Sequence, residues 1–191
     1  MLTHKGTQTI KTQRLILRRF SLSDASDMFN NWAGDERVTR WLTWSPHSSE
    51  AATADLLELW CAEYAKADKY NWAIEYEDRA IGNISVVRHH ERVQWAELGY
   101  CMGAGFWGRG IMTEAVKAVT DFLFDEVGFN RIQISHVDRN PASGAVALKC
   151  GFRFEGTRRQ YALSRNGEFL DVCEYGLLKS DRADQNQKTH E

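Results

Sequence analysis

The sequence predicts an α+β fold, a mixed, mostly antiparallel sheet of about seven strands flanked by about four to five helices. Three observations predict it. Strand-like and helix-like segments follow one another without a regular repeat, three successive strand-like runs are joined by short polar turns, and an Asn-Gly pair joins the last two runs. The 191 residues, 43% of them hydrophobic and 26% charged, fit a single domain over residues 1–191, with a core at about 12–178 and polar ends.

The first part of the chain is expected to run from a strand into helices. Residues 14–20 are rich in leucine and end where Ser21 begins a run of N-cap side chains. The helix that follows carries Met28, Phe29 and Trp32. Two further helices are expected, near residues 35–42 and 49–66.

The rest of the chain alternates between strands and helices. A helix is predicted from just after Gly110 to near Gly128, and a second one from Asn140 and Pro141 through Lys149, with Gly151 at the position of a C-terminal cap. The strands are expected at residues 71–76, 80–87, 93–102, 131–137, 152–163 and 169–178.

Charge and composition exclude several classes of protein. Lys and Arg number 24 against 26 Asp and Glu, a net charge of −2, so the basic excess of a direct nucleic-acid binder is absent. No segment approaches the about 20 apolar residues of a membrane span, and the N-terminal residues lack the apolar run of a secretory signal. We therefore expect a cytoplasmic protein. The 4 cysteines are scattered and His89 and His90 point to opposite faces of a strand or lie in a loop, so no metal site is expected.

A glycine-rich segment, residues 103–115, runs from the end of a strand into a helix. Glycines let backbone N–H groups approach an anion, and the helix N-terminus adds partial positive charge, so this segment predicts phosphate binding. Gly103, Gly105 and Gly108 also fit the dinucleotide fingerprint G-x-G-x-x-G. That fold places the motif in the first of several βαβ units, whereas here three sequential strands precede it, so a nicotinamide or flavin site is not expected.

Three segments resemble the GNAT superfamily of acetyl-CoA-dependent N-acetyltransferases: WGRGIMTEA at 107–115, AELGYCM at 96–102 and RNPASGAVALKCGFRFEG at 139–156. Similarity to the group of bacterial ribosomal-protein-alanine N-acetyltransferases extends through the opening QRLILRRFSLSDASDMFNNW and the closing GTRRQYALSRNGEFLDVCEYGLL. The resemblance implies the GNAT fold, whose central sheet is splayed in the middle. Gly105 replaces the usual Gln or Arg three residues before the first glycine of the motif, which changes little where backbone amides hold the phosphates.

The resemblance implies that acetyl-CoA is the co-substrate and that no metal takes part. The pyrophosphate is expected on the amides of residues 108–113, and the pantetheine arm beside the strand that ends at residue 102. For Arg109, a phosphate contact and an ordinary solvated loop position are both open. The residues expected to bind the cofactor are Tyr100, Met102, Trp107, Gly108, Arg109, Gly110, Met112, Thr113, Asn140 and Ser143.

Two residues are the candidates for catalysis. Glu97 is placed to take the proton of the attacking ammonium, directly or through water, with a purely structural glutamate as the alternative. The tyrosine that many GNAT enzymes use to protonate the leaving thiolate is replaced here by Ala147. Ser143, in an Asn-x-x-Ser pattern like that of the ribosomal-protein group, is expected to protonate or hydrogen-bond the sulfur, while capping of the helix is the alternative for Asn140 and Ser143.

The acceptor is expected to be a primary amine. An α-amine titrates near about 8 and a lysine near about 10.4, so the N-terminus of a protein needs less help to lose its proton and is the favoured acceptor. A small amine such as a polyamine, an amino sugar or an antibiotic is the alternative, and a non-catalytic acyl-CoA-binding module is a second one. Trp41, Trp44 and Tyr161 are the candidate acceptor-binding residues, with core or dimer contacts as the alternative for the two tryptophans. The chain is expected to be a monomer or a homodimer.

Overall fold

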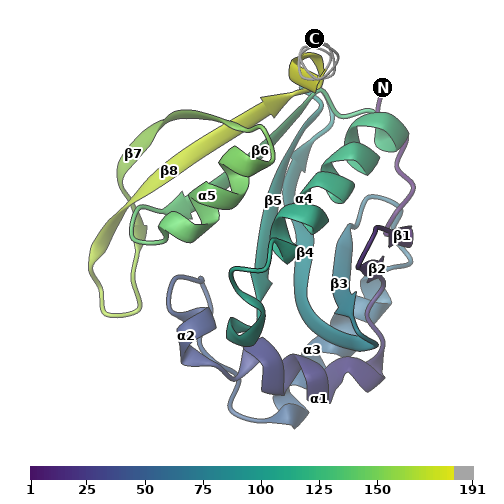
Figure 1. Cartoon of the computed structure of the whole chain (residues 1–191), viewed down its shortest axis with the longest axis vertical. Helices are drawn as coiled ribbons and strands as arrows, with labels where there is room; N and C mark the ends of the chain where they lie inside the picture. Colours follow the sequence, from purple (N-terminus) through teal and green to yellow (C-terminus); the bar gives the residue numbers. More distant parts are fainter. Residues whose placement is uncertain (183–191) are drawn as a thin grey trace. The chain divides into compact units, whose positions relative to one another are not determined.

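The computed structural model describes residues 1–182 and divides the chain into two compact units (Figure 1). The N-terminal unit comprises residues 4–86 and 99–119. The C-terminal unit comprises residues 1–3, 87–98 and the chain from residue 120 onward. The prediction of a single domain stays a prediction.

Eight strands are present in the described residues, one more than expected. Hydrogen bonding connects them in the order β1-β2-β3-β4-β5-β6-β8-β7. Strands β5 and β6 run parallel, while β1–β2, β2–β3, β3–β4, β6–β8 and β8–β7 are antiparallel pairs. The strands are β1 (Ile10–Lys11), β2 (Ile16–Arg18), β3 (Asn71–Tyr76), β4 (Arg79–His90), β5 (Trp95–Met102), β6 (Arg131–Val137), β7 (Arg153–Leu163) and β8 (Phe169–Leu178).

The expected helices all form, although the first begins in a 3-10 turn and ends in a π turn, and the one after Gly110 ends in a π turn. The helical segments are η1 (Leu22–Asp24), α1 (Ala25–Met28), η2 (Phe29–Ala33), α2 (Glu36–Thr39), α3 (Glu50–Glu63), η3 (Ala104–Phe106), α4 (Ile111–Phe122), η4 (Leu123–Val127) and α5 (Pro141–Lys149). Ser49 caps α3 as its sequence predicts, because its side chain accepts a hydrogen bond from the amide of Ala52 at 3.1 Å. No helix of residues 1–182 has the length and apolar character needed to cross a membrane.

The N-terminal unit is organised around the side chains that α1 and α3 place against β3. Figure 1 shows α1 and α3 side by side, and Met28 of α1, Trp32 and Leu57 of α3 are buried in one hydrophobic cluster with Ala73 of β3. Burying a side chain of this size stabilises the fold by about 2–3 kcal/mol. Arg18 ties β2 to this layer through two hydrogen bonds of 2.8 Å to the Asp24 carboxylate.

In the C-terminal unit, α5 covers one face of strands β6, β8 and β7 (Figure 1). Ile132 and Ile134 of β6 are buried on this sheet. Gly144 makes the close approach of the helix possible, since a Cβ at that position would lie 2.7 Å from both Nε2 of His136 and the hydroxyl of Tyr175. Pro141 occupies the first turn of α5, as the sequence predicts.

Several sequence-based expectations were wrong in detail. Residues 1–12 are not a simple polar tail, because Thr7 is buried and Ile10–Lys11 pair with β2 as strand β1. The expected helix at 35–42 ends at Thr39, where Arg40 begins a turn. His89 and His90 lie at the end of strand β4 rather than in a loop. Of the expected polar end at 180–191, residues 183–191 lie outside the described residues.

Candidate active site

The glycine-rich segment leads from the end of β5 to the start of α4 within the N-terminal unit. Gly103 follows β5, and its amide donates to the carbonyl of Ile81 at 2.9 Å. A Cβ on Gly103 would lie 2.6 Å from the carbonyl oxygen of Asn31, so only glycine fits where these two backbones meet. The beginning of the loop is therefore fixed by contacts within its own unit.

The second half of the loop is built for a ligand to approach its backbone. Gly108 and Gly110 have φ values of 75° and 73°, which favour glycine, and no heavy atom of the described chain lies within 4 Å of a Cβ placed on Gly108. The first backbone hydrogen bond of α4 runs from Glu114 to the carbonyl of Gly110 at 3.1 Å. The amides that precede it belong to the end of the helix that attracts anions, so these residues fit a pyrophosphate.

Aromatic side chains hold the tip of the loop. The indole Nε1 of Trp107 donates to the carbonyl of Met102 at 2.8 Å, and 51% of the Trp107 side chain remains exposed. The guanidinium of Arg109 lies 5.6 Å from the ring centroid of Phe106. Arg109 is thus held over an aromatic ring at the loop, a position that still allows a phosphate contact.

Glu114 connects the first turn of α4 to the segment that precedes β2. Its carboxylate accepts hydrogen bonds from Thr12 Oγ1 at 2.6 Å, from the Arg14 amide at 2.9 Å and from Arg14 Nε at 2.7 Å. Burial pushes the pKa of Glu114 upward, but the bonds from Thr12 and Arg14 together hold it below its ordinary value. Sequence reasoning used Glu114 only as a helix signal and missed this role, because its partners are about one hundred residues away in the chain.

The parallel ladder between β5 and β6 stops partway along both strands. It joins Trp95 to Arg131 and ends with Leu98 opposite Ile134, and no further rung is present in the part of the chain that the structure describes. Residues 99–102 continue β5 beyond that point, while residues 135–137 of β6 still pair with β8. Backbone N–H and C=O groups of residues 99–102 are therefore not used by β6.

Glu97 is buried in the C-terminal unit and forms hydrogen bonds with two neighbours. Its Oε2 accepts from both Nε (2.8 Å) and Nη2 of Arg88, and its Oε1 accepts from the hydroxyl of Ser135. The bond to Glu97 raises the pKa of the Arg88 guanidinium, with a smaller contribution from Tyr161. A carboxylate has about four acceptor sites, so three donors leave one for a substrate.

Around Glu97, polar side chains form a network across one face of the sheet. Gln133 donates to Glu174 at 3.0 Å, and Glu174 also pairs with Arg158. The Arg158 guanidinium lies 3.7 Å from the ring centroid of Tyr161, whose side chain is 56% exposed. We call Arg88, Glu97, Ser135, Gln133, Glu174, Arg158 and Tyr161 the Glu97 network. Tyr161 was expected at the acceptor side, and the network brings it to Glu97 through Arg88.

Asn140 and Ser143 occupy the first turn of α5. Asn140 is the N-cap residue by position, but its side chain makes no capping hydrogen bond, so simple capping does not account for it. Its carbonyl accepts from the amide of Ser143 at 3.1 Å. Beside them, Nδ1 of His136 bonds the carbonyl of Val137 at 2.7 Å, while the buried Nε2 has no hydrogen-bond partner among the described residues.

The remaining predicted residues all lie in the N-terminal unit. Met102 and Met112 are buried, whereas Tyr100 and Thr113 are partly exposed. Trp41 was expected on the helix at 35–42, but it lies with Trp44 in the turn after α2. Trp44 packs against the core and against His47, with ring centroids 5.4 Å apart, and Trp41 lies under the guanidinium of Arg40.

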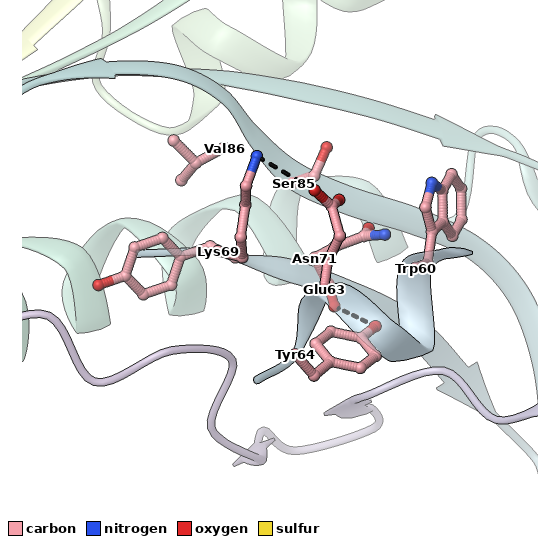
Figure 2. Close-up of a pocket in the computed structure, with 8 residues that line it drawn as sticks. Trp60, Glu63, Tyr64, Lys69, Asn71, Ser85 and Val86 are labelled. Atoms are coloured by element: carbon pink, nitrogen blue, oxygen red, sulfur yellow. Dashed lines mark hydrogen bonds and ion pairs between the residues drawn. The ribbon is translucent and has the colours of Figure 1, made fainter. Parts of the chain in front are cut away.

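A cavity of about 150 Å³ in the N-terminal unit contains none of the predicted site residues (Figure 2). Lys69 and Glu63 face each other across it at 3.5 Å, and the hydroxyl of Tyr64 donates to the carbonyl of Asn71 at 2.8 Å. Burial raises the pKa of Tyr64 to about 12. The charged and hydroxyl groups of this cavity thus bond to neighbours within the N-terminal unit. We therefore treat the cavity as a packing feature beside α3 and not as part of the candidate site.

The predicted residues thus fall into two groups. One group lies in the N-terminal unit, in the glycine-rich segment 103–115, which we call the glycine loop and which includes Trp107 and Arg109. The other group lies in the C-terminal unit, where Arg88 connects Glu97 to Tyr161. Asn140 and Ser143, at the start of α5, belong to the same unit.

Comparison with known proteins identifies the family of the chain. Residues 14–153 match the family model described as an acetyltransferase (GNAT) domain. The uncharacterized N-acetyltransferase YoaA of Bacillus subtilis is 31% identical over 172 residues, which cover 89% of this chain and 96% of the relative. The uncharacterized N-acetyltransferase p20 of Bacillus licheniformis is 28% identical over 178 residues, 92% of this chain and 99% of the relative.

Solved structures confirm the predicted fold. The ribosomal L7/L12 α-N-protein acetyltransferase RimL, determined in complex with coenzyme A, superposes with a TM-score of 0.81 and 22% sequence identity, over 90% of this chain and 98% of that one. At this identity the similarity establishes the α+β GNAT fold.

Proposed function

Since the chain belongs to the GNAT family and is an acetyl-CoA-dependent N-acetyltransferase, we propose that its acceptor is the N-terminal α-amine of a protein. The observation that carries this proposal is the similarity to the ribosomal-protein-serine acetyltransferase of Escherichia coli, 34% identical over 102 residues, 53% of this chain and 56% of that one. The chemistry supports it, because an α-amine with a pKa of about 8 is more readily neutral than a lysine at about 10.4.

For the cofactor, we assign the pyrophosphate to the amides of residues 108–113 and the pantetheine to the edge of residues 99–102. The open space at Gly108 and the left-handed conformation of Gly110 support the first assignment. The end of the β5–β6 ladder at Leu98 supports the second, since among the described residues no rung to β6 is present beyond it. The side chain of Asn140, which makes no capping hydrogen bond to α5, is the candidate partner of the pantetheine amides.

The transfer itself needs one proton acceptor and one proton donor. The amine nitrogen attacks the thioester carbonyl, the new C–N bond forms as the C–S bond breaks, the ammonium proton passes to Glu97, and the thiolate takes a proton from Ser143 or from water. The acceptor site left on Glu97 is sufficient for one N–H or water donor. Trp41, Trp44 and Tyr161 are proposed as contacts of the acceptor.

A free amino acid is a second candidate acceptor. The L-amino acid N-acetyltransferase AaaT of Escherichia coli is 33% identical over 97 residues, 50% of this chain and 59% of that one. Its acceptor class also presents an α-amine, so the two candidates share the reacting group and differ in what surrounds it.

A panel of acceptors separates these possibilities. The protein is incubated with acetyl-CoA and one acceptor at a time, and released thiol is followed. The acceptors are peptides starting with Ser, Ala or Met, the same peptides blocked at the N-terminus and carrying an internal lysine, free amino acids, polyamines and aminoglycosides. We expect thiol release with the unblocked peptides. Release only with free amino acids or polyamines would contradict the proposal, and CoA binding without release for any acceptor would leave a binding module.

Ser143→Ala tests the proposed proton donor. Turnover is expected to fall about tenfold with CoA affinity little changed, because the hydroxyl acts on the leaving sulfur rather than in binding. Ser164→Ala is the matched control, since Ser164 lies in the β7–β8 turn and its Oγ accepts a hydrogen bond from the Glu168 amide at 3.0 Å. Equal turnover of the two variants would show that Ser143 has a helix-terminal role only.

A further inference from the structure

Arg14 lies at the glycine loop although it comes 95 residues earlier in the chain than Arg109. It stands between β1 and β2, and its Nη1 donates to the carbonyl of Arg109 at 3.0 Å. On the other side, Nε donates to Glu114 at 2.7 Å. One guanidinium therefore connects the middle of the loop to the first turn of α4.

The third nitrogen of this guanidinium remains available. Nη2 of Arg14 lies 3.7 Å from the position that a Cβ on Gly110 would occupy, and it forms no hydrogen bond with residues 1–182. The side chain is 39% exposed, so a ligand on the loop can reach it. Because the guanidinium is planar and its other two nitrogens are held, the direction of the Nη2 donors is fixed.

Glu114 makes a cation at this position necessary. An ionised carboxylate in the first turn of α4 opposes the binding of a pyrophosphate to the same helix end. The bond from Arg14 Nε compensates that charge. Without the Arg14 side chain, the Glu114 carboxylate would keep only its hydrogen bonds from the Thr12 hydroxyl and from the backbone amide of residue 14, and its negative charge would face the ligand.

We propose that Arg14 is a cofactor-binding residue, which fixes the loop through the Arg109 carbonyl and donates Nη2 to a phosphate of acetyl-CoA at Gly110. The proposal rests on the proposed placement of the pyrophosphate on residues 108–113. The glycine motif alone predicts phosphate binding by backbone amides. Arg14 adds a side-chain contact from the N-terminal part of the chain.

The test measures CoA affinity by tryptophan fluorescence at a series of salt concentrations. Arg14→Met is expected to weaken CoA binding about tenfold to a hundredfold and to reduce the slope of log Kd against log salt, since one phosphate contact is lost. Arg14→Lys keeps the charge without the planar fork and is expected to lie between Arg14→Met and the wild type. If Arg14→Met does not fold, Arg14→Lys carries the test through CoA affinity alone, and wild-type affinity of Arg14→Lys would then overturn the proposed contact.

Arg182→Met is the matched control. Arg182 pairs with Asp121 and Asp125 near the C-terminal end of α4 and in η4, away from the first turn that contains Glu114, and we expect wild-type CoA affinity for this variant. Unchanged affinity of Arg14→Met, or weaker binding with an unchanged salt slope, would overturn the phosphate contact. Absence of CoA binding by the wild type would instead contradict the proposed placement of the cofactor.

Discussion

The glycine loop and the Glu97 network are two sites built in different ways. The loop uses the backbone of consecutive residues, and it is held by Arg14 from outside and by its own Trp107. The Glu97 network uses side chains contributed by strands β4 to β8, with Glu97 itself buried. A backbone site is sensitive to an added side chain, whereas a network is sensitive to the loss of one, because its partners are left buried without compensation.

The largest expected effect comes from adding a side chain to the loop. Gly110→Asp places a carboxylate where we assign the pyrophosphate, and within reach of Arg14 Nη2. CoA affinity is expected to fall about a thousandfold, because the new carboxylate repels the pyrophosphate and competes with it for the Nη2 donors of Arg14. Isothermal titration calorimetry with CoA measures it.

Gly167→Asp controls for the backbone. Gly167 has a φ of 78° with no heavy atom of the described chain within 4 Å of its Cβ position, so the conformational cost resembles that at Gly110. CoA affinity of Gly167→Asp should equal that of the wild type. Retained affinity in Gly110→Asp would move the pyrophosphate away from the loop.

The second test removes the carboxylate charge from the Glu97 network. Glu97→Gln is nearly isosteric but cannot accept a proton in the same way, and turnover with the true acceptor is expected to fall about a hundredfold at unchanged CoA affinity. Glu155→Gln is the control, because Glu155 also pairs with an arginine, Arg131, on the same sheet. Thermal unfolding of both variants separates a loss of stability from a loss of catalysis; if both lose only stability, Glu97 is structural.

The difference between the two sites also decides what could be predicted from the sequence. The loop, β6 at Arg131–Val137 and α5 at Pro141–Lys149 were predicted well, since glycines, a proline and alternating apolar residues act locally. The partners of Glu97 were not, because hydrogen bonds between distant strands leave no local pattern. Trp41, inside the expected helix at 35–42, lies beyond the end of α2 for a related reason: turn residues after α2 are set by tertiary packing rather than by propensity.

A smaller effect is expected where α5 meets the sheet. Gly144→Ala brings a Cβ to 2.7 Å from His136 Nε2 and from the Tyr175 hydroxyl, so the first turn of α5 must shift. We expect a loss of about 1–3 kcal/mol in the free energy of unfolding and about a tenfold loss of turnover, since Ser143 moves with the helix.

Gly176→Ala is the comparison for this change. Its Cβ would also be crowded, but by the side chains of Glu155 and Arg131 rather than by α5. A similar loss of stability with normal turnover is expected in this variant. Equal turnover losses in both would show that the position of α5 does not matter for the reaction.

The smallest expected effect is a pH-dependent change in the free energy of unfolding. The pKa of Glu114 is lowered in the folded protein, so its contribution to stability is present above its unfolded value of 4.5 and is lost as the pH falls below that through the lower folded value. Glu114→Gln should therefore cost about 1 kcal/mol near neutral pH, a modest amount because its partner Arg14 is partly exposed. Below the folded pKa of Glu114 the two proteins should converge. Urea unfolding of both across this range measures the difference; a gap that persists in acid would show that Glu114 stabilises the loop by packing rather than by its charge.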